Sequence, residues 1–156
     1  MSSPKRIDIE GACYHTISVT RGRRPIFADP TAASLLVECI HFISHESRAY
    51  VLAFCVMPNH LHLLLSPRND ATLSDVMRSL KRFATKQIND ATGRTGSLWQ
   101  QSYYDRVIRD EAHLNATIEY IHRNPVVEGL AVNETAYRFS SAHSEAWSDL
   151  ETYFGE

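Results

Sequence analysis

The sequence predicts one α+β domain, built as an antiparallel sheet with its helices mainly on one face. Its 156 residues, 44% of them hydrophobic, suit a single domain with an ordinary core. Apolar runs of strand length alternate along the chain with longer segments of helical period. Two apolar runs, 51–57 and 61–65, are separated by a tight turn at Pro58-Asn59, which favours two adjacent buried strands.

The first strand and the first helix come before this hairpin. Residues 12–20 alternate loosely and are rich in β-formers, so they predict a strand that ends in a basic turn. Arg21 and Arg23 in that turn are candidate phosphate contacts, and a solvated turn is the alternative. Asp29-Pro30 has the residues of a helix start, and apolar residues at helical spacing over 33–43 predict an amphipathic helix packed on the sheet.

Two histidines begin the second strand of the hairpin. His60 and His62 are two residues apart, so in a strand they project from the same face, roughly 6.5 to 7 Å apart. Leu61, Leu63 and Leu65 form the opposite, apolar face. Two imidazoles so placed can bind one cation between them. The alternative interpretation is a pair of histidines on an exposed strand face that bind no metal.

A second helix is predicted from Thr72 to about Asn89, where apolar residues repeat with a period of 3.6. Its opposite face gathers four basic residues: Arg78, Lys81, Arg82 and Lys86. One-sign clustering in a protein of net charge −2 is typical of a surface that binds the DNA backbone. A solvated outer face is the competing interpretation.

An extended segment and a third helix follow. Residues 97–108 are aromatic and β-branched enough for a strand, and Trp99 is expected in the core rather than as a platform for bases. The helix runs from Glu111 to Asn124, just before Pro125. Tyr120 and Asn124 stand one above the other, about 100° round the helix from its apolar stripe. Tyr120 is therefore not an obvious core residue.

Several of these segments resemble one family. The residues 57–64, MPNHLHLL, resemble the His-hydrophobe-His motif of HUH endonucleases, in the form found in REP-associated tyrosine transposases. The residues 120–126, YIHRNPV, are similar to the tyrosine motif of that family, and the likeness at Trp99-Gln100 and Ile108-Arg109 is looser. The resemblance spans roughly residues 10–145. Arg138 and Phe139 depart from the family pattern near an aromatic-Ser-Ser turn, within a segment, 127–156, that we interpret as a C-terminal tail.

The resemblance implies the HUH endonuclease fold, a ferredoxin-like order of elements, and an activity. It makes Tyr120 the nucleophile and His60, His62 and Asn124 the ligands of a divalent cation, Mg²⁺ or Mn²⁺. The expected reaction nicks and transfers single-stranded or hairpin DNA of REP type through a 5′-phosphotyrosine, in a monomer or homodimer. The expected DNA contacts are Arg21, Arg23, Arg78, Lys81, Arg82, Lys86, Arg106 and Arg109.

A free tyrosine hydroxyl is almost entirely protonated at neutral pH, so such a nucleophile needs activation. Metal-bound water or a nearby histidine, such as His122, are candidates for that base. Two other functions stay open: a DNA-binding domain without chemistry, and a metal-dependent hydrolase in which His60 and His62 activate water. A covalent DNA adduct separates the three.

Composition limits the remaining classes of protein. Three cysteines without C-x-x-C spacing indicate neither a disulfide framework nor a cysteine zinc site. No segment approaches the ~20 apolar residues of a membrane span, and residues 1–12 lack the apolar centre of a signal peptide. The expectation is a cytoplasmic protein without a membrane partner.

Overall fold

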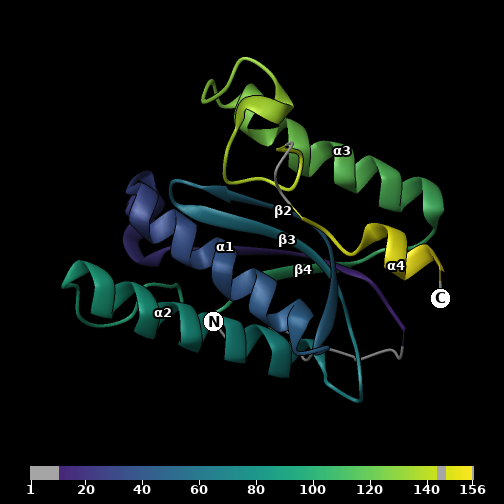
Figure 1. Cartoon of the computed structure of the whole chain (residues 1–156), viewed down its shortest axis with the longest axis horizontal. Coiled ribbons are helices and arrows are strands. Elements are labelled where there is room, and N and C mark those ends of the chain that lie inside the picture. The colour runs from purple at the N-terminus through teal and green to yellow at the C-terminus, as the bar shows by residue number, and fades with distance from the viewer. Residues whose placement is uncertain (1–10, 144–146, 156) are drawn as a thin grey trace.

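Four antiparallel strands form one sheet at the centre of the molecule, in the order β2-β3-β1-β4 (Figure 1). The computed structural model describes residues 11–143 and 147–155. The strands are β1 (Tyr14–Val19), β2 (Ala49–Met57), β3 (His60–Pro67) and β4 (Tyr104–Val107). The main helices are α1 (Pro30–His45), α2 (Leu73–Thr92), α3 (Glu111–Val127) and α4 (Leu150–Gly155), with short 3₁₀ turns at Arg21–Arg23, Ile26–Ala28 and Glu134–Ala136.

The β2–β3 hairpin is apolar on both of its faces. Leu61, Leu63 and Leu65 pack with α1 and α2 in one core cluster, as the alternating pattern predicts. Leu64 points the other way and packs with Leu114 and residues of β2 in a second cluster. A sheet with two apolar faces must be covered on both sides.

The helices accordingly lie on both faces, which corrects the prediction that they lie mainly on one. Helices α1 and α2 lie below the sheet in Figure 1, and α3 lies above it, with α4 on the same side as α3. The predicted α+β class with an antiparallel sheet is confirmed. The order of strands and helices along the chain does not determine which face of the sheet each helix covers.

The helix starts agree with the predicted signals. The side chain of Asp29 accepts a hydrogen bond from the backbone of Thr31, and Thr72 forms a reciprocal capping box with Asp75. Helix α3 continues to Val127 instead of ending before Pro125. Proline in the last turn removes one backbone donor, and the helix ends soon afterwards, where Leu130 N donates to the Pro125 carbonyl at 2.8 Å.

Two aromatic residues test the predicted core. Trp99 is 5% exposed and packs on Phe27, with ring centroids 5.4 Å apart, so its core assignment is confirmed. Phe83 belongs by its helical spacing to the apolar face of α2 but is 38% exposed. It packs against Phe42 of α1 at the edge of the two-helix layer.

The segment after α3 is part of the domain, because it hydrogen-bonds along the free edge of β2. Val56 N donates to the carbonyl of Phe139 at 2.8 Å, and the Tyr137 hydroxyl donates to the Val56 carbonyl at 2.6 Å. Asp149 N donates to the Val51 carbonyl further along the strand. This segment therefore covers an edge that would otherwise be open to pairing.

Some predictions fall on residues 1–10, 144–146 and 156, which lie outside the described part of the chain. They include the expected absence of a signal peptide and parts of the segment 127–156. Among the residues that the structure describes, no helix combines the length and the apolar character that a membrane crossing requires.

Candidate active site

His60 and His62 share one face of β3, as their spacing predicts, and this face is the one beside α3. Their ring centroids are 5.0 Å apart. His62 is only 2% exposed, whereas His60 is partly buried beside the β2–β3 turn, with its Nδ1 2.7 Å from Asn59 Oδ1. The two rings thus sit together under a helix, on a strand whose register is fixed by both neighbours.

A third histidine, His15 of β1, was missed by the sequence analysis. Its Nε2 lies 3.0 Å from Nδ1 of His62, and the two rings stack with centroids 5.3 Å apart. This contact leaves the Nε2 of His62 as the nitrogen that can face a ligand. The available signal was a histidine inside a predicted strand, but nothing local indicated which strand it would meet.

All three histidines favour the neutral form. Burial, together with the neighbouring His60 and His15, lowers the pKa of His62 to about 3. Burial also lowers the pKa of His15 to about 4, assisted by the charge of Arg106. The pKa of His60 falls chiefly through burial, with Glu128 and Asn124 acting in the opposite direction. Neutral imidazoles are the form that binds metal ions.

Tyr120 of α3 lies directly over this histidine group. Its ring meets His62 and His15 edge-on, with centroid distances of 5.6 and 6.1 Å, and the residue is 55% exposed. The tyrosine is therefore in contact with the histidines and still open to a macromolecular substrate. The prediction that Tyr120 lies off the buried stripe of its helix is confirmed.

Asn124 lies one helical turn after Tyr120 and is buried, at 9% exposure. Within the described residues its Oδ1 makes no hydrogen bond, and its side chain is close enough to His60 to influence the pKa of that histidine. An unsatisfied buried oxygen is costly and marks a place where a missing partner would fit. The fold thus brings together residues from β3 and α3 that are about sixty positions apart.

The donor set fits a divalent cation. Two neutral imidazoles and an amide oxygen can hold Mn²⁺, or less favourably Mg²⁺, which prefers oxygen ligands. No group of three or more histidines, cysteines and acidic residues suited to a metal occurs in the part of the chain that the structure describes. The set consequently depends on the Asn124 amide, and the metal-binding role of these residues stays a prediction.

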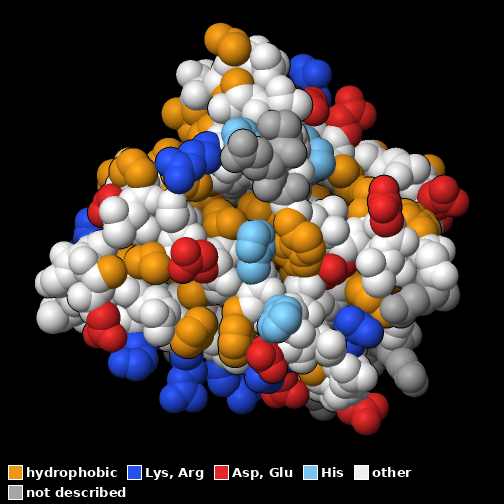
Figure 2. All heavy atoms as spheres, in the orientation of Figure 1, with side chains coloured by type: hydrophobic (Ala, Val, Ile, Leu, Met, Phe, Trp, Pro, Cys, Tyr) orange, Lys and Arg blue, Asp and Glu red, His pale blue; other side chains and the backbone are white. Residues whose placement is uncertain are grey.

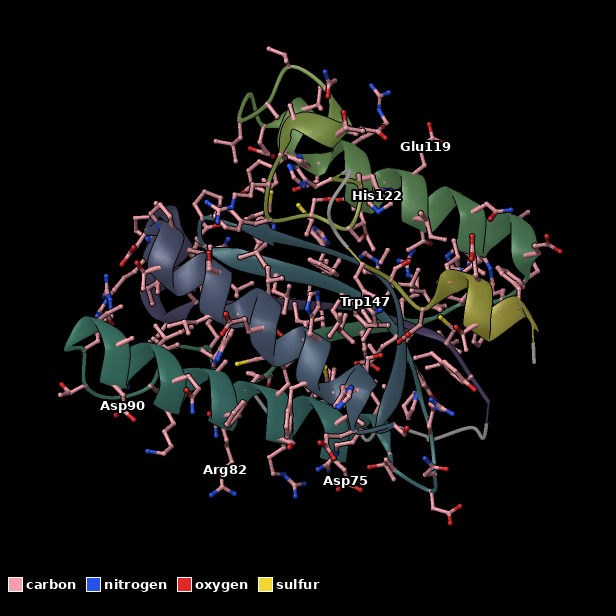
Figure 3. All side chains as sticks on the ribbon, viewed as in Figure 1. Asp75, Arg82, Asp90, Glu119, His122 and Trp147 are labelled. Carbon is pink, nitrogen blue, oxygen red and sulfur yellow. The ribbon has the colours of Figure 1, made fainter. Side chains whose placement is uncertain are left out.

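His122, considered as a base for the tyrosine, points elsewhere. Residues two apart on a helix are about 200° apart around its axis. His122 lies under α3 (Figure 3), with its Nε2 2.7 Å from the Ser141 hydroxyl of the C-terminal segment. It ties α3 to that segment, and His15 and His62 are the histidines beside Tyr120.

The predicted DNA contacts divide into two groups, and the first lies near the histidines. The charge of Arg23 lowers the pKa of His60, and the charge of Arg106 lowers that of His15. Arg21 shares the exposed turn of Arg23. Arg109 follows β4 and donates its backbone N–H to His113 Nδ1 at 3.0 Å. All four arginines are exposed on the side of the candidate site or next to it.

The second group lies on α2, across the sheet from Tyr120. Figure 2 shows Lys and Arg side chains gathered along the lower edge of the molecule, over α2, and Arg82 points away from the sheet in Figure 3. Arg78, Arg82 and Lys86 line a groove of about 770 Å³ together with Arg48. This surface cannot share one short stretch of DNA backbone with the histidine site, because the sheet and α1 lie between them.

Lys81 does not belong to that outer face, contrary to the prediction. Its Nζ donates to the Gln100 carbonyl at 3.2 Å and lies 5.8 and 5.6 Å from the ring centroids of Trp99 and Tyr103. The carbonyl and the two aromatic rings attract the ammonium group inward. Helical angle alone did not reveal this, since the attracting segment is about twenty residues further along the chain.

Known proteins resemble this chain over most of its length. A family model described as "Transposase IS200 like" matches residues 8–124. The REP-associated tyrosine transposase of Escherichia coli K12 is 26% identical over 146 residues, covering 93% of this chain and 85% of that protein. A Haemophilus influenzae protein provisionally given the same name is 28% identical over 109 residues, which are 64% of this chain and 62% of that protein.

Solved structures match as well. The structure of a REP-associated tyrosine transposase bound to a REP hairpin has a TM-score of 0.76 and 26% identity, covering 92% of this chain and 84% of that one. A structure from Deinococcus radiodurans, with a TM-score of 0.55 and 23% identity, covers 83% of this chain and 98% of its own, and shows the same fold. Because the family model matches most of the chain, including the histidine motif and the tyrosine motif as far as Asn124, this protein belongs to the IS200-like transposase family, with REP-associated tyrosine transposases among its relatives.

Proposed function

We propose that this transposase is a metal-dependent single-stranded DNA endonuclease and strand transferase that works through a 5′-phosphotyrosine intermediate. The observation that carries the proposal is the contact of Tyr120 with His62 and His15, one turn before the unsatisfied oxygen of Asn124. An exposed hydroxyl beside a cluster of neutral ligands suits nucleophilic attack on phosphorus.

The roles of the residues follow from their positions. His60, His62 and Asn124 would hold the cation, which when bound supplies polarisation of the scissile phosphate. Nδ1 of His62 is taken by His15, so the ring is held in one orientation with its other nitrogen available. Arg23 and Arg106, on either side of the histidines, add positive charge where a phosphodiester would lie.

The proposed reaction exchanges one phosphoester bond for another. The Tyr120 oxygen forms a bond to phosphorus while the bond from phosphorus to the 3′ oxygen breaks, and the 3′ oxygen leaves as a hydroxyl. A base at the site takes the tyrosine proton, and the departing 3′ oxygen takes up a proton from that base or from water. Attack by another 3′-hydroxyl reverses the step and joins strands without ATP, which is the strand transfer that transposition requires.

The proposed substrate is hairpin DNA of REP type. One structurally similar protein was solved bound to a REP hairpin, and its chain aligns with 92% of this one. Exposed arginines at the site and the basic groove on α2 offer two separate surfaces for such a DNA.

A denaturation-resistant adduct tests the chemistry. Wild-type protein incubated with Mn²⁺ and labelled single-stranded hairpin DNA should form a covalent complex, and mass spectrometry should map it to Tyr120. Tyr120→Phe should form none while still binding DNA, because only the attacking oxygen is lost.

Tyr103→Phe and Tyr104→Phe are the matched controls and should form the adduct. These neighbours point to opposite faces of the sheet, Tyr103 toward Lys81 and Tyr104 toward Tyr120. An adduct that persists in Tyr120→Phe contradicts the assignment. Cleavage without any covalent species would instead favour a hydrolase that activates water.

A further inference from the structure

A groove runs from Tyr120 to the edge of the sheet, between α3 and β4. It has a volume of about 500 Å³, within the size range of sites for small ligands. Its walls include Ala116 and Thr117 of α3, and its floor includes Ile17 of β1 and residues of β4. The groove opens directly beside the tyrosine and the histidines, so whatever is attached to a reacting phosphate can extend along it.

Tyr104 forms the outer end of this groove. In the strand register, His62 pairs with Ile17 and Ile17 pairs with Tyr104, so these side chains project from the same face in one row across three strands. Two strand spacings separate Tyr104 from His62 by about 10 Å. The Tyr104 ring is 66% exposed on an edge strand. The ring therefore presents an open face beside the groove, on which a nucleic-acid base can stack.

The charge of the groove is that of a phosphate-binding surface. Arg106 pairs with His15 in the strand register and lines the groove next to Tyr104. Asp105, between them, also lines the groove, but it pairs with the buried Thr16, and the alternation of the strand directs its side chain to the opposite face of the sheet. The groove therefore offers an aromatic ring and a guanidinium group together, which is the combination that binds single-stranded nucleic acid.

We infer that the groove between α3 and β4 binds an unpaired nucleotide next to the cleaved bond, with its base stacked on Tyr104 and its phosphate on Arg106. The occupant is single-stranded DNA rather than the interior of a duplex, because a base inside a duplex is already stacked between its neighbours and has no free face for Tyr104. The inference rests on the proposed function, since it places the strand that Tyr120 attacks.

The test is an affinity comparison in the Tyr120→Phe protein, which cannot turn over. Two labelled DNAs are used, a hairpin with single-stranded flanks and the same stem without flanks. Tyr104→Ala should weaken binding of the flanked hairpin by about tenfold and leave the bare stem unchanged. Tyr104→Phe keeps the ring and should bind normally. Arg106→Ala should lower the log-log salt slope for the flanked DNA by about 0.7.

Phe42→Ala is the matched control, because it removes a 45% exposed ring from the opposite layer and should change neither affinity. Equal affinity of Tyr104→Ala and its parent for the flanked hairpin, or an equal loss on the bare stem, overturns the inference. Adduct formation by the protein with an intact Tyr120 is measured in parallel. If the protein with Tyr120 forms adducts normally but Tyr104→Ala does not change the affinity for the flanked hairpin, only the groove is rejected. If Tyr104→Ala weakens binding of the flanked hairpin but the protein with Tyr120 forms no adducts, only the proposed chemistry is rejected.

Discussion

The two faces of the sheet are both largely apolar, but they differ along β3, where one face carries only leucines and the other carries two histidines. On the side of α1 and α2, β3 presents Leu61, Leu63 and Leu65, all at most 1% exposed within one continuous core. On the side of α3, the same strand presents His60, His62 and Leu64. One face is closed by two helices, and the other is left partly open beside Tyr120.

The difference indicates how one strand serves both stability and function. Since side chains alternate, the leucines fix the register of β3 and thereby fix the positions of the histidines between them. Polar residues are tolerated on the α3 side for two reasons. The buried ring of His62 makes a hydrogen-bonding contact with His15, and the leucines of the opposite face pack in a continuous apolar core with α1 and α2. Neighbouring residues of β3 should therefore respond very differently to substitution.

The largest expected effects compare His60 with Leu61. His60→Ala should abolish Mn²⁺ binding, because it removes one of the proposed ligands. DNA cleavage should then fall by roughly a hundredfold or more, because polarisation by a metal contributes several kcal/mol. Leu61→Ala should lower the free energy of unfolding by about 2 to 5 kcal/mol through the cavity it leaves. Cleavage per folded molecule should survive in Leu61→Ala. Urea unfolding, Mn²⁺ titration and a nicking assay measure the three quantities.

Normal cleavage by His60→Ala in Mn²⁺ would mean that the histidine face is structural. So would a loss of unfolding free energy in His60→Ala as large as that in Leu61→Ala. His45→Ala, an exposed histidine at the end of α1, controls for the loss of an imidazole in general and should leave all three quantities unchanged.

A smaller effect is expected at His15. Because its ring holds that of His62, His15→Ala should weaken Mn²⁺ binding by about tenfold or somewhat more, without removing a ligand. His15→Gln should recover part of the affinity, since an amide can still hydrogen-bond to Nδ1 of His62. Calorimetric titration at pH 7.5 measures both variants. An unchanged affinity in His15→Ala would mean that the contact serves packing alone.

Features set by local periodicity were predictable from the sequence. The shared face of His60 and His62 follows from the strand period, and the placement of Tyr120 above Asn124 follows from the helix period. The helix starts at Asp29 and Thr72 carry their own capping signals, which the structure reproduces. Each of these predictions needed only residues within a few positions of one another.

Features that depend on distant residues could not be predicted in this way. His15 becomes part of the site only through the pairing of β1 with β3, and its partner His62 is 47 positions away. Lys81 turns inward because of Gln100 and two aromatic rings in a later segment. His122 is directed to Ser141, which lies beyond the end of α3. In each case the decisive neighbour is set by tertiary packing.

Acid should destabilise the metal-free protein through its histidine face. The pKa values of His62 and His15 fall to about 3 and about 4 in the folded state, below the ordinary value near 6.5 of an unfolded chain. As the pH drops below 6.5, the unfolded state therefore binds protons that the folded state does not. The free energy of unfolding should fall by up to about 1.4 kcal/mol per pH unit for each histidine, until the folded pKa is reached.

Urea unfolding between pH 7.5 and 4.5, with a chelator present, measures this slope. The double variant His15→Gln/His62→Gln should show a shallower slope, because neither amide titrates. Leu61→Ala is the control from the other face: its curve should lie lower at every pH but keep the wild-type slope. Equal slopes in the wild type and the double glutamine variant would contradict the assignment of these protons.

The smallest effect is expected on the outer surface of α2. Arg82 and Lys86 are exposed, and the contact of Lys86 with Asp90 at 3.1 Å lies in solvent and is worth little, so a phosphate can replace Asp90. If this groove holds the DNA backbone, Arg82→Ala/Lys86→Ala should lower the log-log salt slope of hairpin binding by roughly 0.7 to 0.9 per lost contact. Lys81→Ala should leave the slope unchanged, since its ammonium group faces Gln100 rather than the groove. Binding of the Tyr120→Phe protein to a labelled hairpin, measured across a salt series, decides the matter. An unaltered slope in the double variant would confine DNA binding to the α3 side of the sheet.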